Sequence, residues 1–208
     1  MKKAKIKKIV NKVFGTMSNN IFWKYRHLWD RNWVVGYISK ESLEHPHRKL
    51  LIEKIGKFDS LLEVGCGAGA NLKLLNEKYP DAKLYGMDIS PRAIKEVRKW
   101  RKENVSVKVG HELWRLKSKS VDIVLTDAVL IYTSPKDIKE TLEELLRIAR
   151  KKVVLCEQHG DDVYDGNWIH DYKRIFNELG VDAQFTKITN WVGNWNKYGY
   201  IIEYDHSN

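Results

Sequence analysis

The stretch LLEVGCGAGANLKLL, residues 61–75, decides the fold of this chain. An apolar run leads into three glycines within five positions, and an apolar pattern with helical spacing follows. Glycine adopts backbone conformations that side chains exclude, and the start of a helix offers free N–H groups. The stretch therefore predicts a first strand, a turn that approaches a ligand and a first helix.

Short apolar runs alternate with helical patterns on both sides of this turn. The runs cover residues 60–64, 83–88, 105–109, 121–126 and 152–157, and helical patterns separate them at about 70–79, 91–103 and 135–149. Such alternation predicts a doubly wound α/β fold, in which helices cover both faces of a parallel sheet.

The end of the chain departs from this alternation. After a helix at about 168–179, the strand-like runs AQFTKIT (183–189) and YGYIIEY (198–204) are separated by the loop NWVGNWNK. Eight residues are too few for a crossover helix, so the last strand should run antiparallel to the others.

The amino-terminal part of the chain has no strand character. The segment 19–33 is rich in aromatic residues, and the segment 41–58 has the pattern of a helix with Pro46 near its first turn. A chain of 208 residues without repeats or a low-complexity linker fits one sheet domain. We expect an amino-terminal helical extension over residues 1–48 and a ligand-binding domain over residues 49–208.

The net charge of +10 is concentrated in the first residues. Residues 1–29 contain eight Lys or Arg and no Asp or Glu, which leaves 29 basic and 27 acidic residues elsewhere. Within residues 1–14, apolar positions at helical spacing are interrupted by lysines, which predicts a short basic amphipathic helix. This helix either contacts an anionic membrane surface or acidic partner, or packs on its own domain with its lysines in solvent.

The sequence also limits the location of the protein. No stretch approaches eighteen consecutive apolar residues, and lysines interrupt the amino terminus, which excludes a spanning helix and a secretory signal there. Cys66 and Cys156 give no disulfide framework and no metal-ligand spacing, so we expect reduced, buried cysteines and no metal. The expected location is the cytoplasm, with peripheral contact at the inner face of the membrane if the amino-terminal helix binds lipid.

The glycine turn fits two kinds of cofactor by spacing alone. Gly65, Gly67 and Ala70 match the G-x-G-x-x-G/A pattern of dinucleotide-binding turns. Glu63 lies two residues before the turn, where its carboxylate would repel a pyrophosphate but would suit a ligand that carries an ammonium and a sulfonium. Gly69 makes the turn wider than a dinucleotide-binding turn, which also favours a ligand with an ammonium and a sulfonium.

The end of the predicted second strand carries a further ligand-binding residue. Asp88 ends the run KLYGMD, where a carboxylate accepts hydrogen bonds from both ribose hydroxyls of any adenosine cofactor. Ser90 and Pro91 then form a helix cap and a first-turn proline, which places Asp88 at the carboxyl edge of the sheet.

Four segments in order resemble the motifs of the class I S-adenosylmethionine-dependent methyltransferases. They are LLEVGCGAGANLKLL, LYGMDISPRAI, KSVDIVLTDAVLIY and ELLRIARKKVVLCE, and the resemblance covers about residues 50–158. It implies a Rossmann-like seven-stranded sheet of order 3-2-1-4-5-7-6, with strand 7 antiparallel. It also implies S-adenosylmethionine as cofactor.

The resemblance assigns the cofactor contacts by position. Glu63, Gly65, Gly67 and Gly69 would lie near the methionine moiety, Asp88 would bind the ribose and Ile89 would touch the adenine. Asp127 and Ala128 would flank the methionine end. Many family members have Gly-Asp after the third strand, whereas this chain has Gly110, His111 and Glu112. Either His111 or Glu112 would then meet the adenine amino group.

Three residues at the predicted carboxyl ends of strands are candidates for catalysis. His159 is the first choice for a general base because an imidazole titrates near neutral pH, and a surface histidine is the alternative. His170 is the second candidate, with packing under the terminal hairpin as the alternative. Tyr132 is either a catalytic group or a wall of the pocket, and Glu157 either orients a base or fastens the loop.

The expected substrate is a small molecule. The chain lacks the (Asp/Asn)-Pro-Pro-(Tyr/Phe) element of DNA amino-methylases, which disfavours a DNA amino-methylase. The motifs resemble small methyltransferases of sugar, lipid or secondary-metabolite biosynthesis, including a group associated with pseudaminic acid, in which a histidine stands where this chain has Tyr132. Tryptophans at both ends of the chain would form either an aromatic lid or core packing.

We therefore expect methyl transfer to oxygen or nitrogen of a small molecule, such as a carbohydrate or a lipid-linked compound. One alternative is an RNA or protein methyltransferase that uses the basic amino-terminal helix. The other is a non-catalytic module that only binds S-adenosylmethionine.

Overall fold

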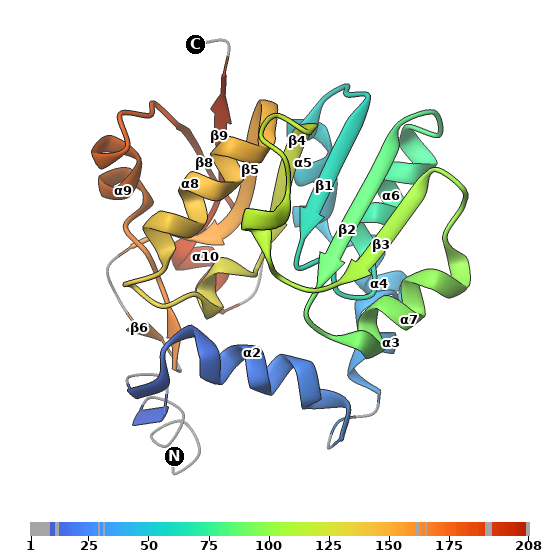
Figure 1. Cartoon of the computed structure of the whole chain (residues 1–208), viewed down its shortest axis with the longest axis horizontal. Coiled ribbons are helices and arrows are strands. Elements are labelled where there is room, and N and C mark those ends of the chain that lie inside the picture. Colours follow the sequence, from blue (N-terminus) through green and yellow to red (C-terminus); the bar gives the residue numbers. More distant parts are fainter. Residues whose placement is uncertain are drawn as a thin grey trace.

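A computed structural model describes residues 9–10, 13–28, 30, 32–160, 163–164, 166–189 and 193–206. Seven strands form one sheet in the order β3-β2-β1-β4-β5-β9-β8 (Figure 1). The strands are β1 (Ser60–Val64), β2 (Lys83–Asp88), β3 (Val105–Val109), β4 (Val121–Asp127), β5 (Ala149–Gln158), β8 (Gln184–Lys187) and β9 (Gly199–Asp205). β9 runs antiparallel to β5 and β8, and the other neighbouring strands are parallel. The predicted order and the antiparallel last strand are confirmed.

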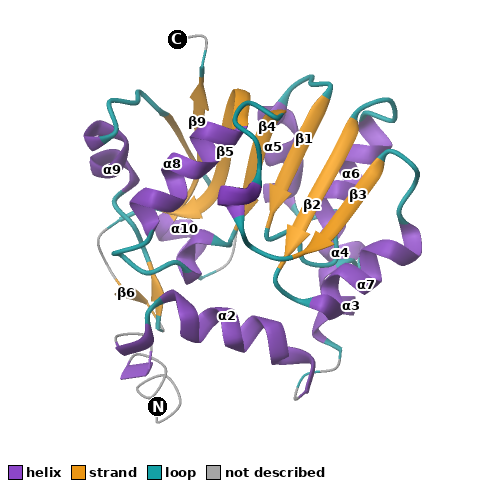
Figure 2. Cartoon of the chain, in the orientation of Figure 1, coloured by secondary structure: helices purple, strands orange, loops and turns teal. Residues whose placement is uncertain are grey.

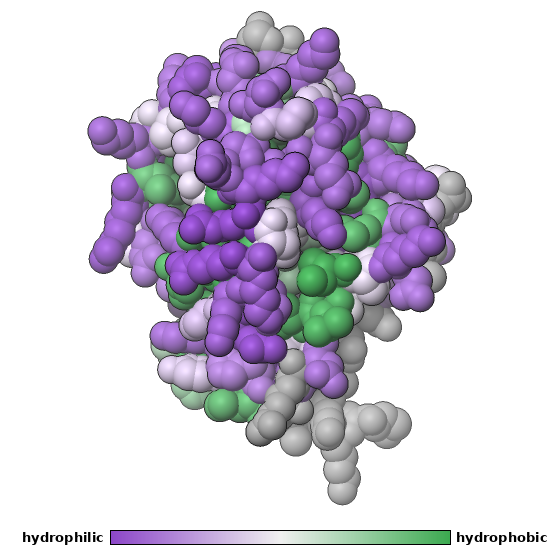
Figure 3. Space-filling model, turned by 90° about the vertical axis from the view of Figure 1, so that its right-hand side faces the viewer, coloured by the Kyte–Doolittle hydropathy of each residue, from purple (hydrophilic) through white to green (hydrophobic). Residues whose placement is uncertain are grey.

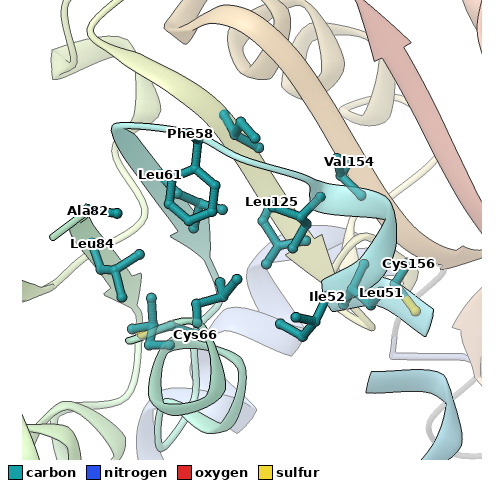
Figure 4. Close-up of a cluster of buried hydrophobic side chains, with 14 of the residues drawn as sticks. Leu51, Ile52, Phe58, Leu61, Cys66, Ala82, Leu84, Leu125, Val154 and Cys156 are labelled. Carbon is teal, nitrogen blue, oxygen red and sulfur yellow. The ribbon is translucent and has the colours of Figure 1, made fainter. Parts of the chain in front are cut away.

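Helices cover both faces of the sheet (Figure 2). One hydrophobic cluster packs beneath α5 (Pro46–Ile55), α6 (Ala70–Lys78) and α7 (Pro91–Trp100), and the other packs beneath α8 (Ile138–Ile148) and α9 (Tyr172–Glu178). Adjacent strand residues such as Leu61 and Leu62 belong to opposite clusters, because side chains alternate between the faces of a strand. Figure 4 shows part of the first cluster, which includes Cys66 and Cys156 as buried free thiols.

Several element boundaries differ from the predicted ones. The helix expected to end at 149 gives way to β5 at Ala149, because this residue already adopts an extended conformation and pairs with Val121 of β4. The helix expected from 168 begins at Tyr172, and Asn167–Trp168 (β7) instead forms a two-residue hairpin with Val163–Tyr164 (β6). The loop at 190–197 contains the start of a short helix, α10 (Asn194–Tyr198).

The amino-terminal extension is helical, as expected, but it is divided into short pieces. They are α2 (Thr16–Tyr25), the 3-10 turn η1 (Arg26–Leu28), α3 (Trp33–Tyr37) and α4 (Lys40–Leu43). The helix predicted over 41–58 is split, because His45 caps α5 and Pro46 opens it. The boundary expected between residues 48 and 49 lies within α5. Residues 1–8, 11 and 12 of the predicted basic helix lie outside the described residues, whereas Ile9, Val10, Val13 and Phe14 are helical.

α2 lies across the carboxyl ends of the central strands (Figure 1). Thr16 Oγ1 donates to Asp137 Oδ2 at 2.5 Å and accepts from the backbone amide of Ser134 at 2.8 Å. Asn19 Nδ2 donates to the carbonyl oxygen of Tyr132 at 3.1 Å. These contacts fasten α2 to the segment that follows β4, at the edge where α/β sheets bind ligands.

Candidate functional site

The glycine turn between β1 and α6 requires glycine at three positions. Gly65, Gly67 and Gly69 have φ angles of 71°, 53° and 82°, in the left-handed region that side chains disfavour. A Cβ atom at Gly65 would overlap the side chain of Val129, and one at Gly69 would overlap the ring of Trp100. The turn is therefore fixed both by its backbone conformation and by close packing around it.

Asp88, at the end of β2, faces this turn. Its Oδ2 accepts from the amide of Gly67 at 2.9 Å, and its Oδ1 accepts from the amide of Ser90 at 2.7 Å. Burial raises the pKa of Asp88 from its ordinary value, and the two backbone donors oppose this shift. Each carboxylate oxygen retains a further lone pair, so the pair of oxygens suits a vicinal diol such as a ribose.

Glu63, near the end of β1, is buried beside the first turn of α6. Its Oε1 accepts from Nδ2 of Asn71 at 2.8 Å, whereas its buried Oε2 has no hydrogen-bond partner among the described residues. Burial raises the pKa of Glu63 to about 8. A buried carboxyl oxygen without a donor is a receptor for a cationic or N–H group, and an ammonium would satisfy it.

Asp127, at the end of β4, is paired with a residue of α5. Arg48 Nη1 lies 3.1 Å from Asp127 Oδ2 and donates to Oδ1 of Asn71 at 2.5 Å. Arg48 Nε donates to the carbonyl oxygen of Ser42 at 2.8 Å, which holds the guanidinium in place. Burial acts to raise the pKa of Asp127, but contacts with His47 and Arg48 outweigh it and hold this pKa below its ordinary value. Asp127 is therefore a buried carboxylate, kept charged by its neighbours.

Two histidines continue from Asp127 toward the surface. His47 Nε2 lies 3.6 Å from Asp127 Oδ2, and His47 Nδ1 lies 2.7 Å from Nδ1 of His45. His47 is buried and His45 is partly exposed. The 2.7 Å contact requires one proton between the two ring nitrogens, and the backbone amide of His47, 3.4 Å from His45 Nδ1, makes that nitrogen the acceptor.

The loop after β4 contains a non-glycine residue in the left-handed region. Ala128 has a φ of 58°, and the next two amides, of Val129 and Leu130, donate to Oε1 of Glu157 at 2.9 and 3.0 Å. The hydroxyl of Thr126 donates to the same oxygen at 2.9 Å. Burial raises the pKa of Glu157 to about 7. Of the two roles expected for Glu157, its contacts correspond to fastening the loop.

His159 and His170 are bonded to backbone groups. His170 Nε2 lies 3.1 Å from the carbonyl oxygens of both Leu130 and Thr133, so this nitrogen carries a proton and donates to them. His159 Nδ1 accepts from the amide of Tyr172 at 3.2 Å. Burial lowers the pKa of both rings. Both histidines hold segments together at this edge, and their catalytic role stays a prediction.

An aromatic cluster covers the glycine turn. Tyr132 packs edge-on against Trp23 with ring centroids 5.0 Å apart, and burial raises its pKa. Trp33 packs against Ala68 of the turn and contacts Trp23 and Tyr37 at centroid distances of 5.6 and 5.5 Å. Trp23 and Trp33 therefore pack in a hydrophobic cluster beside the turn, which corresponds to the packing alternative for these tryptophans.

The remaining predicted residues follow β2 and β3. Ile89 is partly buried and comes directly after Asp88. His111 and Glu112 come after β3, where Glu112 Oε2 accepts from the amide of His111 at 3.1 Å. The structure thus places these residues on neighbouring strand ends with Asp88, and it brings Glu63, Asp127 and Ala128 together at β1 and β4.

Sequence reasoning missed three polar residues of the site. His47 and Arg48 precede the motifs, and Asn71 lies within the first turn of α6. All three are buried. The sequence did contain a signal for two of them, because His47 and Arg48 lie on the apolar side of the helix that begins at Pro46. A buried basic residue needs a partner, so these two indicate a buried acidic group nearby.

The chain is similar in sequence and in fold to known methyltransferases. Residues 61–152 match a family described as a methyltransferase domain. The chain is 24% identical over 128 residues to a trans-aconitate 2-methyltransferase of Escherichia coli O1:K1, which covers 62% of this chain and 48% of that protein. The chain thus spans about half the length of the curated relatives it matches.

Solved structures share the fold over most of the chain. A magnesium protoporphyrin IX methyltransferase from Synechocystis PCC 6803 with bound S-adenosylmethionine has a TM-score of 0.68 at 16% identity, covering 91% of this chain and 96% of that one. A methyltransferase from Aquifex aeolicus that depends on S-adenosylmethionine has a TM-score of 0.64 at 18% identity, covering 83% and 96%.

Residues 61–152 thus match a methyltransferase domain in sequence, and the chain shares the fold of these S-adenosylmethionine-dependent methyltransferase structures. The residues of the site fit S-adenosylmethionine, the ligand that is bound in the Synechocystis structure. The unsatisfied Oε2 of Glu63 suits the ammonium, the guanidinium of Arg48 suits the carboxylate, and Asp88 suits the ribose.

The raised pKa of Glu63 predicts that cofactor binding releases a proton. With a pKa of about 8, this carboxyl is mostly protonated at pH 7, and an adjacent ammonium favours its charged form. We expect release of about one proton per cofactor bound at pH 7, and less as the pH rises above 8. Calorimetry in two buffers with different heats of ionisation measures this release.

Glu63→Gln is the matched control, because it keeps the shape of the side chain but cannot titrate. It should bind the cofactor with the same heat in both buffers. Equal heats for the unmodified protein would contradict the assignment of Glu63 to the ammonium.

Proposed function

We propose that the chain is an S-adenosylmethionine-dependent methyltransferase that acts on oxygen, or on nitrogen, of a small molecule. The observation that supports this most strongly is the cluster of Glu63, Asn71, Arg48 and Asp127. In this cluster a carboxyl oxygen of Glu63 has no hydrogen-bond partner among the described residues, and the guanidinium of Arg48 lies nearby. These two groups would bind the ammonium and the carboxylate of an amino-acid end group. The relatives named for trans-aconitate and magnesium protoporphyrin IX support a small-molecule substrate.

The chain contributes mainly orientation to such a reaction. The bound cofactor supplies an activated methyl group that is transferred by in-line displacement. Glu63 and Arg48 would hold its amino-acid end, Asp88 its ribose, and Ile89 with His111 or Glu112 its adenine. Trp23, Trp33 and Tyr37 would shield the site from water. Tyr132 would form a wall of the acceptor pocket.

An acceptor hydroxyl must lose its proton, and the two histidines beside Asp127 offer an acceptor for it. His45 Nδ1 accepts from the backbone amide of His47 as the cap of α5, so in the 2.7 Å contact the proton belongs to His47 Nδ1, and His47 Nε2 lies 3.6 Å from Asp127 Oδ2. A proton taken up at Nε2 of His47 would give that ring a positive charge, which Asp127 stabilises and which the Nδ1 contact shares with His45. We propose this pair of histidines as the proton acceptor, with His159 as the alternative.

Two variants separate these candidates. His45→Gln should lower kcat about tenfold and flatten the acid limb of the pH–rate profile, because the cofactor supplies most of the driving force. Cofactor affinity should not change. A His159→Gln variant that loses activity instead, with His45→Gln at full rate, would assign the proton acceptor to His159.

The function is tested by incubating the protein with methyl-labelled S-adenosylmethionine and fractionated cell extract. Label in small molecules or lipids supports the proposal. Label in RNA or protein would support the second candidate, in which the eight basic residues of the first 29 bind a polyanion. Cofactor binding without any labelled product would indicate a non-catalytic module.

We also propose a cytoplasmic location, with residues 1–14 in contact with the inner face of the membrane. The described residues of this segment support it, because Ile9, Val13 and Phe14 are helical and exposed. No helix in the described ranges is long and apolar enough to cross a bilayer.

A further inference from the structure

The outward side of α2 and η1 is apolar. Met17, Ile21, Tyr25 and Leu28 follow each other at helical spacing, and 55%, 52%, 43% and 66% of their surfaces are exposed. We call these four residues the outer face. An exposed apolar stripe of this kind on a monomer marks an interaction surface. The carboxyl-terminal end of the preceding helical segment, with exposed Val13 and Phe14, leads into it.

The opposite side of α2 is fixed to the candidate site. Thr16 and Asn19 bond to the segment after β4, and Trp23 packs against Tyr132. The guanidinium of Arg26 lies 4.8 Å from the ring of Trp23. Because the inner residues make these contacts, the outer face cannot turn toward the core without breaking them.

The sequence around the outer face is mostly basic, and Asp30, the nearest acidic residue along the chain, is paired with Arg26 at 3.0 Å. Residues 1–29 contain eight Lys or Arg and no acidic residue, and Lys24 lies between Ile21 and Tyr25 on the same side of the helix. By contrast, the face of the molecule in Figure 3 is mostly hydrophilic, with a small hydrophobic patch. Apolar side chains flanked by lysines fit the headgroup layer of an anionic bilayer. An RNA would use the cations but would leave the exposed aliphatic groups in water.

We propose that the outer face binds an anionic membrane surface, so that the site beneath α2 takes its acceptor from among membrane amphiphiles. The substrate class rests on the proposed methyl transfer, whereas the membrane contact does not. α2 lies across the carboxyl edge of the sheet (Figure 1), and its inner residues contact Tyr132 in the segment that follows Asp127 at the end of β4. A helix lying on the bilayer would therefore bring this edge to the lipid headgroups.

Sedimentation with lipid vesicles tests the membrane contact on the full chain. The vesicles are phosphatidylglycerol mixed with phosphatidylcholine, or phosphatidylcholine alone. We expect binding to the anionic vesicles that weakens with salt, and a loss of about tenfold or more in the Met17→Glu/Ile21→Glu double variant. Trp114→Glu is the matched control, because Trp114 is 65% exposed on the turn η2 (Leu113–Arg115), and it should bind like the unmodified protein.

Equal vesicle binding by the double variant and the unmodified protein would overturn the proposal, as would binding to an RNA oligomer with no binding to anionic vesicles. Calorimetry with S-adenosylmethionine and unchanged thermal unfolding show that each variant is folded, since the outer face lies outside the cofactor contacts.

The acceptor class has its own readout. Label from methyl-labelled cofactor should appear in the organic phase of a membrane extract, at a rate that the double variant lowers. Label confined to water-soluble compounds would overturn the acceptor class. Vesicle binding without any methyl transfer would instead overturn the proposed function alone.

Discussion

Replacing Asp88 with alanine is expected to weaken S-adenosylmethionine binding by about 100-fold, which corresponds to about 3 kcal/mol. The carboxylate would accept hydrogen bonds from two ribose hydroxyls, and each hydrogen bond to a charged group contributes about 1.5 kcal/mol or more. The variant also loses the acceptor for the amide of Gly67, which loosens the turn itself. Isothermal titration calorimetry measures the affinity directly.

Asp81→Ala is the matched control for this variant. Asp81 is exposed in the turn before β2, at the opposite end of that strand from Asp88. It should leave the affinity unchanged. If Asp88→Ala binds as tightly as the unmodified protein, Asp88 does not hold the ribose.

Replacing Arg48 with methionine is expected to lower the free energy of unfolding by about 3 to 5 kcal/mol. Methionine preserves much of the packing but leaves the Asp127 side chain, which is 8% exposed, without its guanidinium partner. The oxygen of Asn71 also loses its donor. Urea unfolding measures the change, and cofactor affinity should fall in the same variant if Arg48 binds the carboxylate.

Arg92→Met provides the comparison. Arg92 forms a partly exposed ion pair with Glu96 at 3.2 Å, four residues along α7, and such pairs contribute about 0.5 kcal/mol. If Arg48→Met lowers the free energy of unfolding no more than Arg92→Met does, the network around Asp127 adds little to stability.

The central strands were predictable because their signal is local. β1, β2 and β3 have the predicted bounds, since each is a continuous buried or alternating run between clear turn residues. β5 was placed too late in the sequence, because Ala149 and the basic residues after it resemble the end of a helix. These residues form a strand because β5 pairs with β4 and β9, and such long-range pairing cannot be seen in the local sequence pattern.

Site residues could be located from the sequence where a single turn or the end of a single strand requires a particular residue type. Glu63, Asp88 and the three glycines could be located in this way. Arg48 could not, because its partner Asp127 lies 79 residues further along the chain. The carboxyl group of Glu157 illustrates the same limit: sequence placed it at the edge but did not distinguish loop fastening from orienting a base.

The position of α5 has a consequence for comparing and recombining proteins of this kind. His47 and Arg48 lie upstream of residue 61, where the family match begins, yet they bond to its strand ends. An alignment restricted to the matched segment therefore includes Asp127 but leaves out the basic residues His47 and Arg48 that contact it. Exchanging the first 55 residues with those of a relative would therefore replace His47, Arg48 and α2 in one step, so we expect the charge balance around Asp127 and the contacts of α2 to change together.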